Sequence, residues 1–167
     1  MKSFQKIFIL LFLFYSCKVE KNSNSIEEWV SLFNGKDLNG WNIKIANHSL
    51  NDNFNNTFQV QDSMIRVVYT EYDDFDDKYG HMYYKTPYSY YKLRFDYRFI
   101  EEQTSGGENW NVRNSGVMIH SQSAKSNAFE QHFPVSLEIQ LLGGLNKGER
   151  TTANLCTPGT AVYFNGK

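Results

Sequence analysis

YKLRFDYRF, at residues 91–99, is the stretch that most clearly indicates the fold. In this stretch the apolar and aromatic residues alternate strictly with the charged ones, at positions Tyr91, Leu93, Phe95, Tyr97 and Phe99. Successive side chains of a strand point to opposite faces, so this period of two predicts a strand with one buried face. On a helix the same aromatic residues would scatter around the axis.

Further strand-like segments lie on both sides of this stretch. Shorter strands are predicted at 58–60, 64–69, 81–85, 115–121, 135–142 and 161–164. Turn-forming residues separate them, among them Asn34-Gly35, Gln61-Asp62-Ser63, Gly143-Gly144 and Pro158-Gly159. Many short strands with regular turns and no clear helix are typical of a sandwich or barrel. The expected fold class is therefore all-β.

The last residues carry a turn signal. Asn165-Gly166 is a strong type I′ hairpin pair that follows the predicted strand at 161–164, and only one lysine comes after it. We therefore expect that the returning strand is missing and that the sandwich is truncated at its C-terminus. An unpaired sheet edge of this kind favours association with other chains.

The N-terminus has the features of an export signal. Lys2 and Lys6 precede an apolar run at 7–15, and Ser16-Cys17 follows it. The run is far shorter than the roughly 20 residues that a transmembrane helix needs. A cysteine directly after the small residue predicts cleavage by signal peptidase II and lipidation of Cys17. The alternative is ordinary secretion with a cysteine there by chance.

The chain is thus expected to have three parts. Residues 1–16 form a lipoprotein signal peptide, 17–28 the lipidated cysteine with a polar tether, and 29–167 a single β-sandwich domain. A lipid anchor attaches a soluble domain to a membrane without making it span the bilayer. The expected location is the bacterial cell envelope, either periplasmic or surface-exposed.

Charge and motif content exclude several classes of function. Removal of the signal peptide leaves 15 basic and 18 acidic residues and no basic stripe, so nucleic acid is not an expected partner. The sequence has no nucleophile elbow, phosphate loop, CxxC pair or HExxH motif, so serine-hydrolase, nucleotide-binding and zinc-protease functions lack support. Cys156 is the only cysteine after Cys17, which excludes a disulfide within the mature domain.

Two predicted strands carry the most informative polar residues. Along 114–120 and 136–142 the odd positions are mostly apolar, whereas the even positions include Asn114, His120, Glu138 and Gln140. If the apolar sets point inward and the strands are neighbours, these four side chains converge on one outer surface. A carboxylate, an imidazole and two amides could there bind the hydroxyls of a sugar. The alternative is an ordinary solvated sheet face.

Three other polar features are weaker signals. Residues 72–77 hold four carboxylates, which Ca²⁺ could use, but the EF-hand pattern is lacking and a solvated loop is the better interpretation. His81 follows this run at a predicted strand start, where a site position and a surface position fit equally well. His132 has no spacing that marks it as a ligand.

Several motifs together resemble one protein family. LFNGKDLNGW at 32–41 is similar to the opening of the DUF1080 family, described as 3-keto-disaccharide hydrolases or 3-keto-glucoside lyases and hydratases. The similarity continues through 90–99, RNSGV at 113–117 and SLEIQ at 136–140, and so covers essentially the whole mature chain. The resemblance implies a concanavalin A/laminin G-like jelly roll, export to the envelope, and action on glycosides oxidised at sugar C3.

An enzyme that acts on such glycosides needs an acid and a base. Glu138, which falls on a motif position of the family, is expected to act as a general base or metal ligand. His120 is expected to act as an acid or second ligand, although here the chain departs from the family, which often has arginine at this position. A divalent metal ion is an expected cofactor. The expected substrate-binding residues are Asn114, Gln140, Arg113 and Trp110.

Two other functions stay open at this point. One is a non-catalytic carbohydrate-binding module of the same fold, with Trp41, Trp110 or Tyr83 as stacking platforms. The other is a structural envelope protein, whose sign would be a large exposed apolar patch.

Overall fold

The computed structural model describes residues 28–100, 102–163 and 165. The chain divides after Val30, and every element named below lies in the unit that begins at Ser31. The predicted signal peptide, Cys17 and most of the predicted tether lie outside the described residues. Among the residues that are described, no helix is both long and apolar enough to cross a bilayer.

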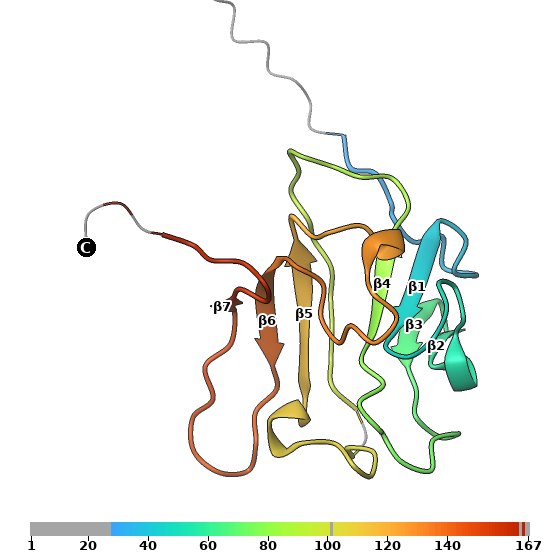
Figure 1. Cartoon of the computed structure of the whole chain (residues 1–167), viewed down its shortest axis with the longest axis vertical. Coiled ribbons are helices and arrows are strands. Elements are labelled where there is room, and N and C mark those ends of the chain that lie inside the picture. Colours follow the sequence, from blue (N-terminus) through green and yellow to red (C-terminus); the bar gives the residue numbers. More distant parts are fainter. Residues whose placement is uncertain (1–27, 101, 164, 166–167) are drawn as a thin grey trace, which may run out of the picture. The chain divides into compact units, whose positions relative to one another are not determined.

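The unit is all-β, as predicted, and its strands pair in antiparallel fashion (Figure 1). Three pairings are found among the described residues: β1 with β4, β2 with β3, and β5 with β6 and then β7. The arrangement is consistent with a jelly-roll sandwich. The strands are β1 (Trp41–Ile45), β2 (Phe58–Gln61), β3 (Met64–Val67), β4 (Gly80–Tyr84), β5 (Asn114–Ile119), β6 (Leu137–Leu142) and β7 (Asn154–Cys156). Single turns of 3-10 helix occur at η1 (Phe54–Asn56), η2 (Asn109–Asn111) and η3 (Ala124–Ser126).

The hydrophobic core is built by β1, β2 and β4. Ile43, Ile45 and Phe58 are buried together, and Leu38, Phe54 and Met82 pack against them. Gly80 allows this close packing, since a Cβ there would lie 3.2 Å from atoms of both Ile45 and Phe58. The sequence analysis missed β1, although Ile43 and Ile45 show the alternation of a half-buried strand.

The LFNGKDLNGW motif forms the turn that leads into β1. The Asn34 side-chain oxygen accepts hydrogen bonds from the backbone N–H groups of Lys36 and Asp37, at 2.8 and 3.0 Å. The Asp37 carboxylate in turn accepts hydrogen bonds from the Asn34 side chain and from the Asn39 backbone N–H. Both bonds lower the pKa of Asp37, and the bond from Asn34 has the larger effect. The Trp41 indole donates to the Leu32 carbonyl at 3.1 Å. The motif therefore holds the start of the sheet.

The turn predicted between residues 58–60 and 64–69 is confirmed. Gln61 pairs with Met64, so Asp62 and Ser63 alone connect β2 and β3. Both have positive φ, 51° and 57°, as a two-residue type I′ hairpin requires.

The stretch at 91–99 differs from its prediction. It belongs to no strand among the described residues, and Tyr91, Leu93, Phe95 and Tyr97 are between 44% and 51% exposed. The predicted buried strand is therefore wrong here. The alternation itself is real, because the ring centroids of Phe95 and Tyr97 lie 6.0 Å apart and those of Tyr97 and Phe99 5.8 Å apart. Residues two apart thus share one side of an extended chain, but none of the strands found in the described ranges pairs with this segment.

One other strand prediction needs correction near the C-terminus, and one strand there was missed. Residues 161–163 form no strand, and Phe164 lies outside the described residues. The strand of this region is instead β7, which the sequence analysis did not predict.

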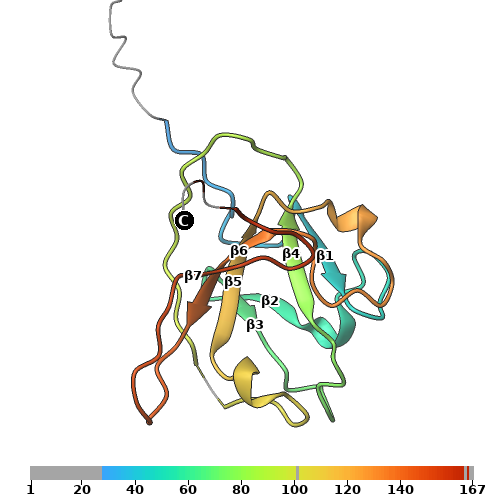
Figure 2. The ribbon, with the colours of Figure 1, turned by 60° about the vertical axis from the view of Figure 1, so that its left-hand side comes forward.

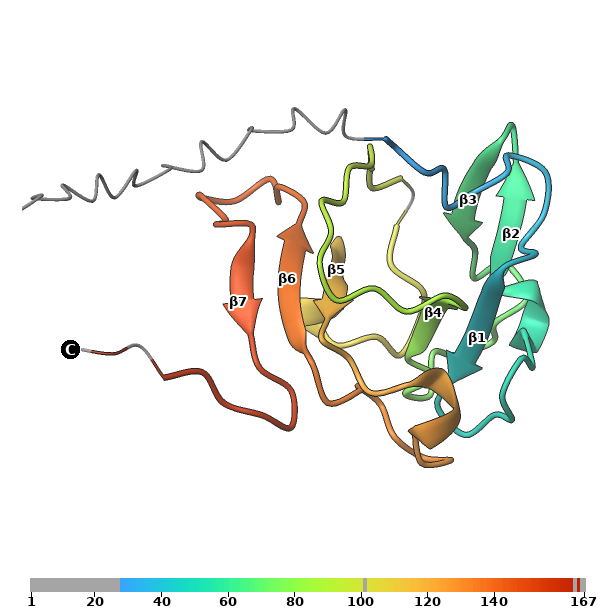
Figure 3. The same cartoon turned by 90° about the horizontal axis from the view of Figure 1, so that it is seen from above.

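The three-stranded sheet lies beside the β1–β4 pair. Figures 2 and 3 both show β4 next to β5, and Figure 3 shows β2 and β3 beyond β1. Hydrogen bonds join the two regions: the Asn127 amide donates to the Tyr83 hydroxyl at 3.1 Å, and the Lys44 ammonium donates to the Phe129 carbonyl at 3.0 Å. The segment between β5 and β6 therefore packs onto β1 and β4.

Candidate functional site

The register of β5, β6 and β7 brings polar side chains to one face. Met118 pairs with Glu138 and Gly116 with Gln140, and β7 continues the rows with Cys156 opposite Glu138 and Asn154 opposite Gln140. Directly opposed residues of an antiparallel sheet project to the same side. We call this side the polar face, and its members are Asn114, Gly116, Met118, Glu138, Gln140, Asn154 and Cys156. The prediction that β5 and β6 are neighbours and place Asn114, Glu138 and Gln140 on one side is confirmed.

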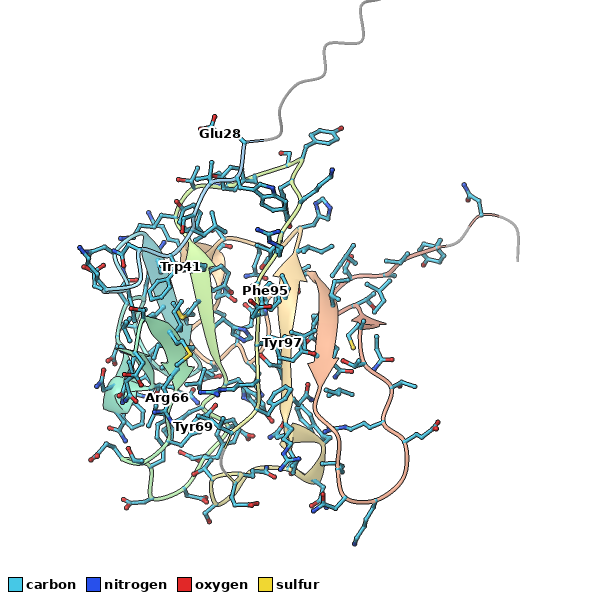
Figure 4. The ribbon with its side chains drawn as sticks, turned by 180° about the vertical axis from the view of Figure 1, so that it is seen from behind. Glu28, Trp41, Arg66, Tyr69, Phe95 and Tyr97 are labelled. Carbon is cyan, nitrogen blue, oxygen red and sulfur yellow. The ribbon has the colours of Figure 1, made fainter. Side chains whose placement is uncertain are left out.

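The opposite side of the sheet meets an aromatic residue at its end. A Cβ on Gly143, two positions beyond Leu141, would lie 2.7 Å from the Phe99 ring. Figure 4, drawn from behind, shows Phe95 and Tyr97 on the segment that leads to Phe99. The apolar side thus meets this segment at Phe99, and the polar face points the other way.

The Glu138 side chain lies across Gly116. A Cβ on residue 116 would lie 2.7 Å from Cγ of Glu138 and would overlap its Oε1. Any side chain at this position would have to displace the carboxyl group. The presence of glycine in the RNSGV motif is therefore explained by packing, because a larger residue would occupy the space of the carboxyl group of the SLEIQ motif.

The carboxyl of Glu138 is half-buried, and burial raises its pKa. A hydrogen bond with the Cys156 thiol opposes this increase. The pKa of Cys156 is raised as well, by burial first and then by the neighbouring carboxylate. A carboxylate with a raised pKa is a stronger base than an exposed one, which suits proton abstraction near neutral pH.

The amides of the polar face are linked across β6 and β7. The Asn154 NH₂ group donates to Oε1 of Gln140 at 3.2 Å and to the Thr151 carbonyl at 3.2 Å. In the described part of the chain the Gln140 NH₂ group has no hydrogen-bond partner, so it can donate to a bound hydroxyl.

An exposed tryptophan lies at the Asn114 end of the face. Trp110 is 50% exposed, and its ring stacks on Tyr79 with centroids 5.9 Å apart and planes 7° apart. The Asn114 amide donates to the Trp110 carbonyl at 3.0 Å, and the Arg150 guanidinium donates to the same carbonyl at 3.3 Å. The indole is therefore held in place with one ring face packed, as a stacking platform for a sugar requires.

The two arginines near this end support the backbone. Arg113 donates to the Gly144 carbonyl at 2.7 Å. Arg150 donates to the Val112 carbonyl at 2.6 Å and the Gly143 carbonyl at 3.0 Å, which ties the start of β5 to the end of β6. The sequence analysis did not single out Arg150, because a lone arginine in a loop carries no local signal.

The position of His120 corrects one expectation. β5 ends at Ile119, and His120 follows it exposed and with a φ of 49°. The alternation that was to place its side chain beside Glu138 stops one residue earlier. The strand register therefore does not determine whether the His120 side chain lies on the polar face, and its predicted role stays a prediction.

The other histidine and carboxylate signals have structural explanations. His81 is partly buried rather than exposed, and burial lowers its pKa, although a hydrogen bond to the His132 carbonyl raises it in part. Its Nε2 donates to that carbonyl at 2.7 Å, so this nitrogen has a structural partner. The acidic run lines an open pocket of about 300 Å³, where Asp76 pairs with Lys78 at 2.6 Å. This matches the expected solvated loop.

The donor set does not fit a metal ion. In the ranges that the structure describes, no three His, Cys, Asp or Glu side chains gather into a group that could hold one. In the ladders of the described residues, the cross-strand partners of Glu138 are Met118 and Cys156, and His120 lies beyond the end of β5. The divalent ion stays a prediction from the resemblance, and no step proposed below passes through it.

Two members of the face were missed from sequence. Asn154 and Cys156 alternate with the apolar Leu155, which is a strand signal, but three residues are too few to identify a strand by period alone.

Comparison with known proteins adds one finding. Residues 28–165 match the family model described as the 3-keto-alpha-glucoside-1,2-lyase-like domain. No curated protein sequence and no solved structure matches the chain.

Proposed function

Because the chain belongs to the 3-keto-alpha-glucoside-1,2-lyase-like family, we propose that it cleaves glycosides that carry a ketone at sugar C3, and that it does so at the polar face. The family description supports a carbohydrate substrate. The observation that carries the proposal for this chain is Glu138, a half-buried carboxyl that lies over Gly116 with a raised pKa.

The proposed reaction is an elimination. The C3 ketone acidifies the hydrogen on C2, because the electron pair left behind is delocalised as an enolate. Glu138 takes that proton, the enolate collapses, a double bond forms between C1 and C2, and the C1–oxygen bond breaks. The leaving oxygen gains a proton, for which His120 is the candidate donor. Addition of water across the double bond then completes a net hydrolysis, by a route unlike the two-carboxylate mechanism of most glycosidases.

The remaining polar residues of the face are proposed to bind the substrate. Gln140 lies two positions from Glu138 on the same side of β6, at about 7 Å along the strand. Its NH₂ group can donate to a sugar hydroxyl while Asn154 holds its oxygen. Asn114 and Arg113 act more indirectly, since their side chains hold the backbone at Trp110 and Gly144.

A binding module without catalysis is the second candidate, and Trp110 is the observation that favours it. Of the three proposed platforms, Trp41 donates its indole N–H to Leu32 and packs edge-on to Tyr84. Tyr83 is largely enclosed, with its hydroxyl bonded to Asn127. Trp110 alone of these three is exposed enough to stack on a sugar.

Turnover separates the two functions. The full chain would be incubated with an aryl 3-keto-glucoside and the release of the aglycone measured. We expect Glu138→Gln to lower kcat/KM by about 10²- to 10⁴-fold, the range for loss of a general base. Glu130→Gln, in an exposed loop, is the matched control and should keep wild-type activity.

Two outcomes would contradict the proposal. Equal activity of wild type and Glu138→Gln would remove Glu138 from the reaction. Binding of unmodified glycans with no turnover of keto-sugars, and loss of that binding in Trp110→Ala, would identify a binding module instead.

A further inference from the structure

The side chain of Gln140 is held by an amide of the neighbouring strand. Gln140 and Asn154 are directly opposed in the β6–β7 ladder. The Asn154 NH₂ group donates to the Thr151 carbonyl at 3.2 Å and to Oε1 of Gln140 at 3.2 Å. A backbone carbonyl only accepts hydrogen bonds, so the contact with Thr151 determines which end of the Asn154 amide carries the NH₂ group. Asn154 is therefore the donor to Gln140, and the atom that it meets is the oxygen.

The NH₂ group of Gln140 is left as an oriented donor. It is not among the described side-chain atoms that are both buried and unpaired, and no described residue accepts from it, so it is open to solvent. The amide could turn over only by losing the bond from Asn154 and placing two NH₂ groups against each other. The sheet therefore presents an N–H donor of fixed direction on the polar face.

The Glu138 carboxyl leans toward the row of Gln140. Gly116 is the cross-strand partner of Gln140, whereas the partner of Glu138 on β5 is Met118. The carboxyl nevertheless lies over Gly116, where a Cβ would overlap its Oε1. Since opposed Cβ positions of an antiparallel pair are about 5 Å apart, this oxygen lies within about 7 Å of the Gln140 Cβ. One sugar ring can therefore meet both groups.

The proposed elimination needs a base and a donor at neighbouring atoms of the substrate. The proton leaves C2, and negative charge develops on the oxygen of the ketone at C3. A pre-oriented N–H donor at that oxygen stabilises the transition state more than the ground state, because the charge is largest as the C2 proton is removed. Glu138 and Gln140 are the pair of side chains on β6 that fits these two tasks.

We propose that Gln140 donates a side-chain N–H to the C3 ketone oxygen of the substrate, and that Asn154 is the positioning residue that holds the amide in this orientation. The inference rests on the proposed function for the identity of the substrate. It specifies the oxygen that Gln140 binds as the ketone rather than a ring hydroxyl. The electron pair from C2 moves onto that oxygen as Glu138 takes the proton, and it returns as the leaving oxygen departs from C1.

Infrared spectroscopy of the bound ketone tests the contact without turnover. The full chain with Glu138→Gln would be mixed with an aryl 3-keto-glucoside isotopically labelled at C3, and the stretching frequency of the labelled carbonyl measured. A hydrogen bond weakens the C=O bond, so binding should lower the frequency. Addition of Gln140→Met, which has a similar length and no donor, should abolish this shift. Asn154→Asp should also abolish it, because its carboxylate accepts from the Gln140 NH₂ group and turns the amide oxygen toward the substrate.

Kinetics test whether the contact serves the reaction. In the chain with Glu138 intact, Gln140→Met should lower kcat by about 10²- to 10³-fold with a smaller change in KM, as for the loss of one oxyanion donor. Asn154→Asp should lower kcat by at least about tenfold, as for the loss of one hydrogen bond. Gln59→Met, on β2 and outside the polar face, is the matched control and should change neither kcat nor the carbonyl frequency.

An equal carbonyl frequency with Gln140 and with Gln140→Met would overturn the inference, and so would an unchanged kcat in Gln140→Met. An unchanged frequency in Asn154→Asp would overturn the positioning role of Asn154. A lowered frequency in a chain that releases no aglycone would contradict the proposed function alone, and absence of any bound keto-sugar would contradict both proposals. Should Gln140→Met not fold, Gln140→Glu is the second variant, since its ionised carboxylate has a similar shape and no hydrogen to donate.

Discussion

At the scale of single residues, Gly116 is as important for the proposed site as Glu138, because it leaves the space that the Glu138 carboxyl group occupies. Its place in the sequence, between Ser115 and Val117, would suit many small residues of a strand. Only the position of Glu138 over it explains why a side chain is excluded. A glycine inside a strand often marks such a close approach.

Substitution of Gly116 by alanine tests this account. We expect Gly116→Ala to displace the Glu138 carboxyl, to lower aglycone release nearly as much as Glu138→Gln, and to destabilise the fold by about 1–3 kcal/mol through overpacking. Gly144→Ala is the matched control, because nothing lies within 4 Å of a Cβ there. Activity and urea unfolding would be measured for both variants, and equal effects of the two would refute the steric explanation.

The raised pKa of Glu138 predicts a pH-dependent stability. Folding favours the protonated form, so the contribution to stability is fully present below the ordinary carboxyl pKa and is lost as pH rises through the folded pKa of Glu138. Glu138→Gln, which cannot ionise, should therefore gain stability relative to wild type at pH 7, and this gain should vanish near pH 4. Urea unfolding at the two pH values measures it, with Glu130→Gln as reference. A gain of the same size at both pH values would contradict the assignment.

At the scale of elements, the extended segment at 91–99 is the largest departure from expectation. Its aromatic residues lie on one side, yet no strand pairs with it in the described part of the chain. Contiguous exposed apolar side chains favour association. The alternating row is formed by Tyr91, Leu93, Phe95 and Tyr97.

We expect this row to drive self-association of the chain. Phe95→Lys should lower the apparent mass at high protein concentration, measured by sedimentation or light scattering, because it places a charge in the middle of the row. Tyr90→Lys is the control, since Tyr90 is 98% exposed but lies off the row. A concentration-independent mass in wild type would exclude such association.

At the scale of the whole molecule, the predicted lipid anchor determines where the polar face would meet its substrate. Cys17 and the apolar run before it lie outside the described residues, so anchoring at the envelope remains our proposal. Lipidation at one cysteine would leave Cys156 as the only thiol of the mature chain.

Expression with a labelled fatty acid tests the anchor. We expect the wild-type chain to incorporate the label and to fractionate with membranes, whereas Cys17→Ser should lose both properties. Cys156→Ser is the control and should behave as wild type. Label in Cys17→Ser, or a wild-type chain that is secreted without label, would contradict lipidation.

Local sequence patterns are sufficient to predict the properties that depend on neighbouring residues. The alternation along 136–142 and 114–119 already predicts which residues share a face, because the period of two is a property of any extended chain. The β2–β3 turn and the all-β class follow from the same local rules. Membership of the family was also visible in sequence motifs spread along the chain.

Which distant segments meet became visible in the folded chain. Cys156 opposes Glu138, Arg150 ties η2 to the strand ends, and the segment at 91–99 has no pairing strand in the described ranges. β5 ends at Ile119 and the next residue, His120, has a left-handed φ, so strand alternation does not determine the side on which its imidazole lies. Strand pairing and burial depend on contacts between residues far apart in the chain, and local alternation carries no information about such contacts.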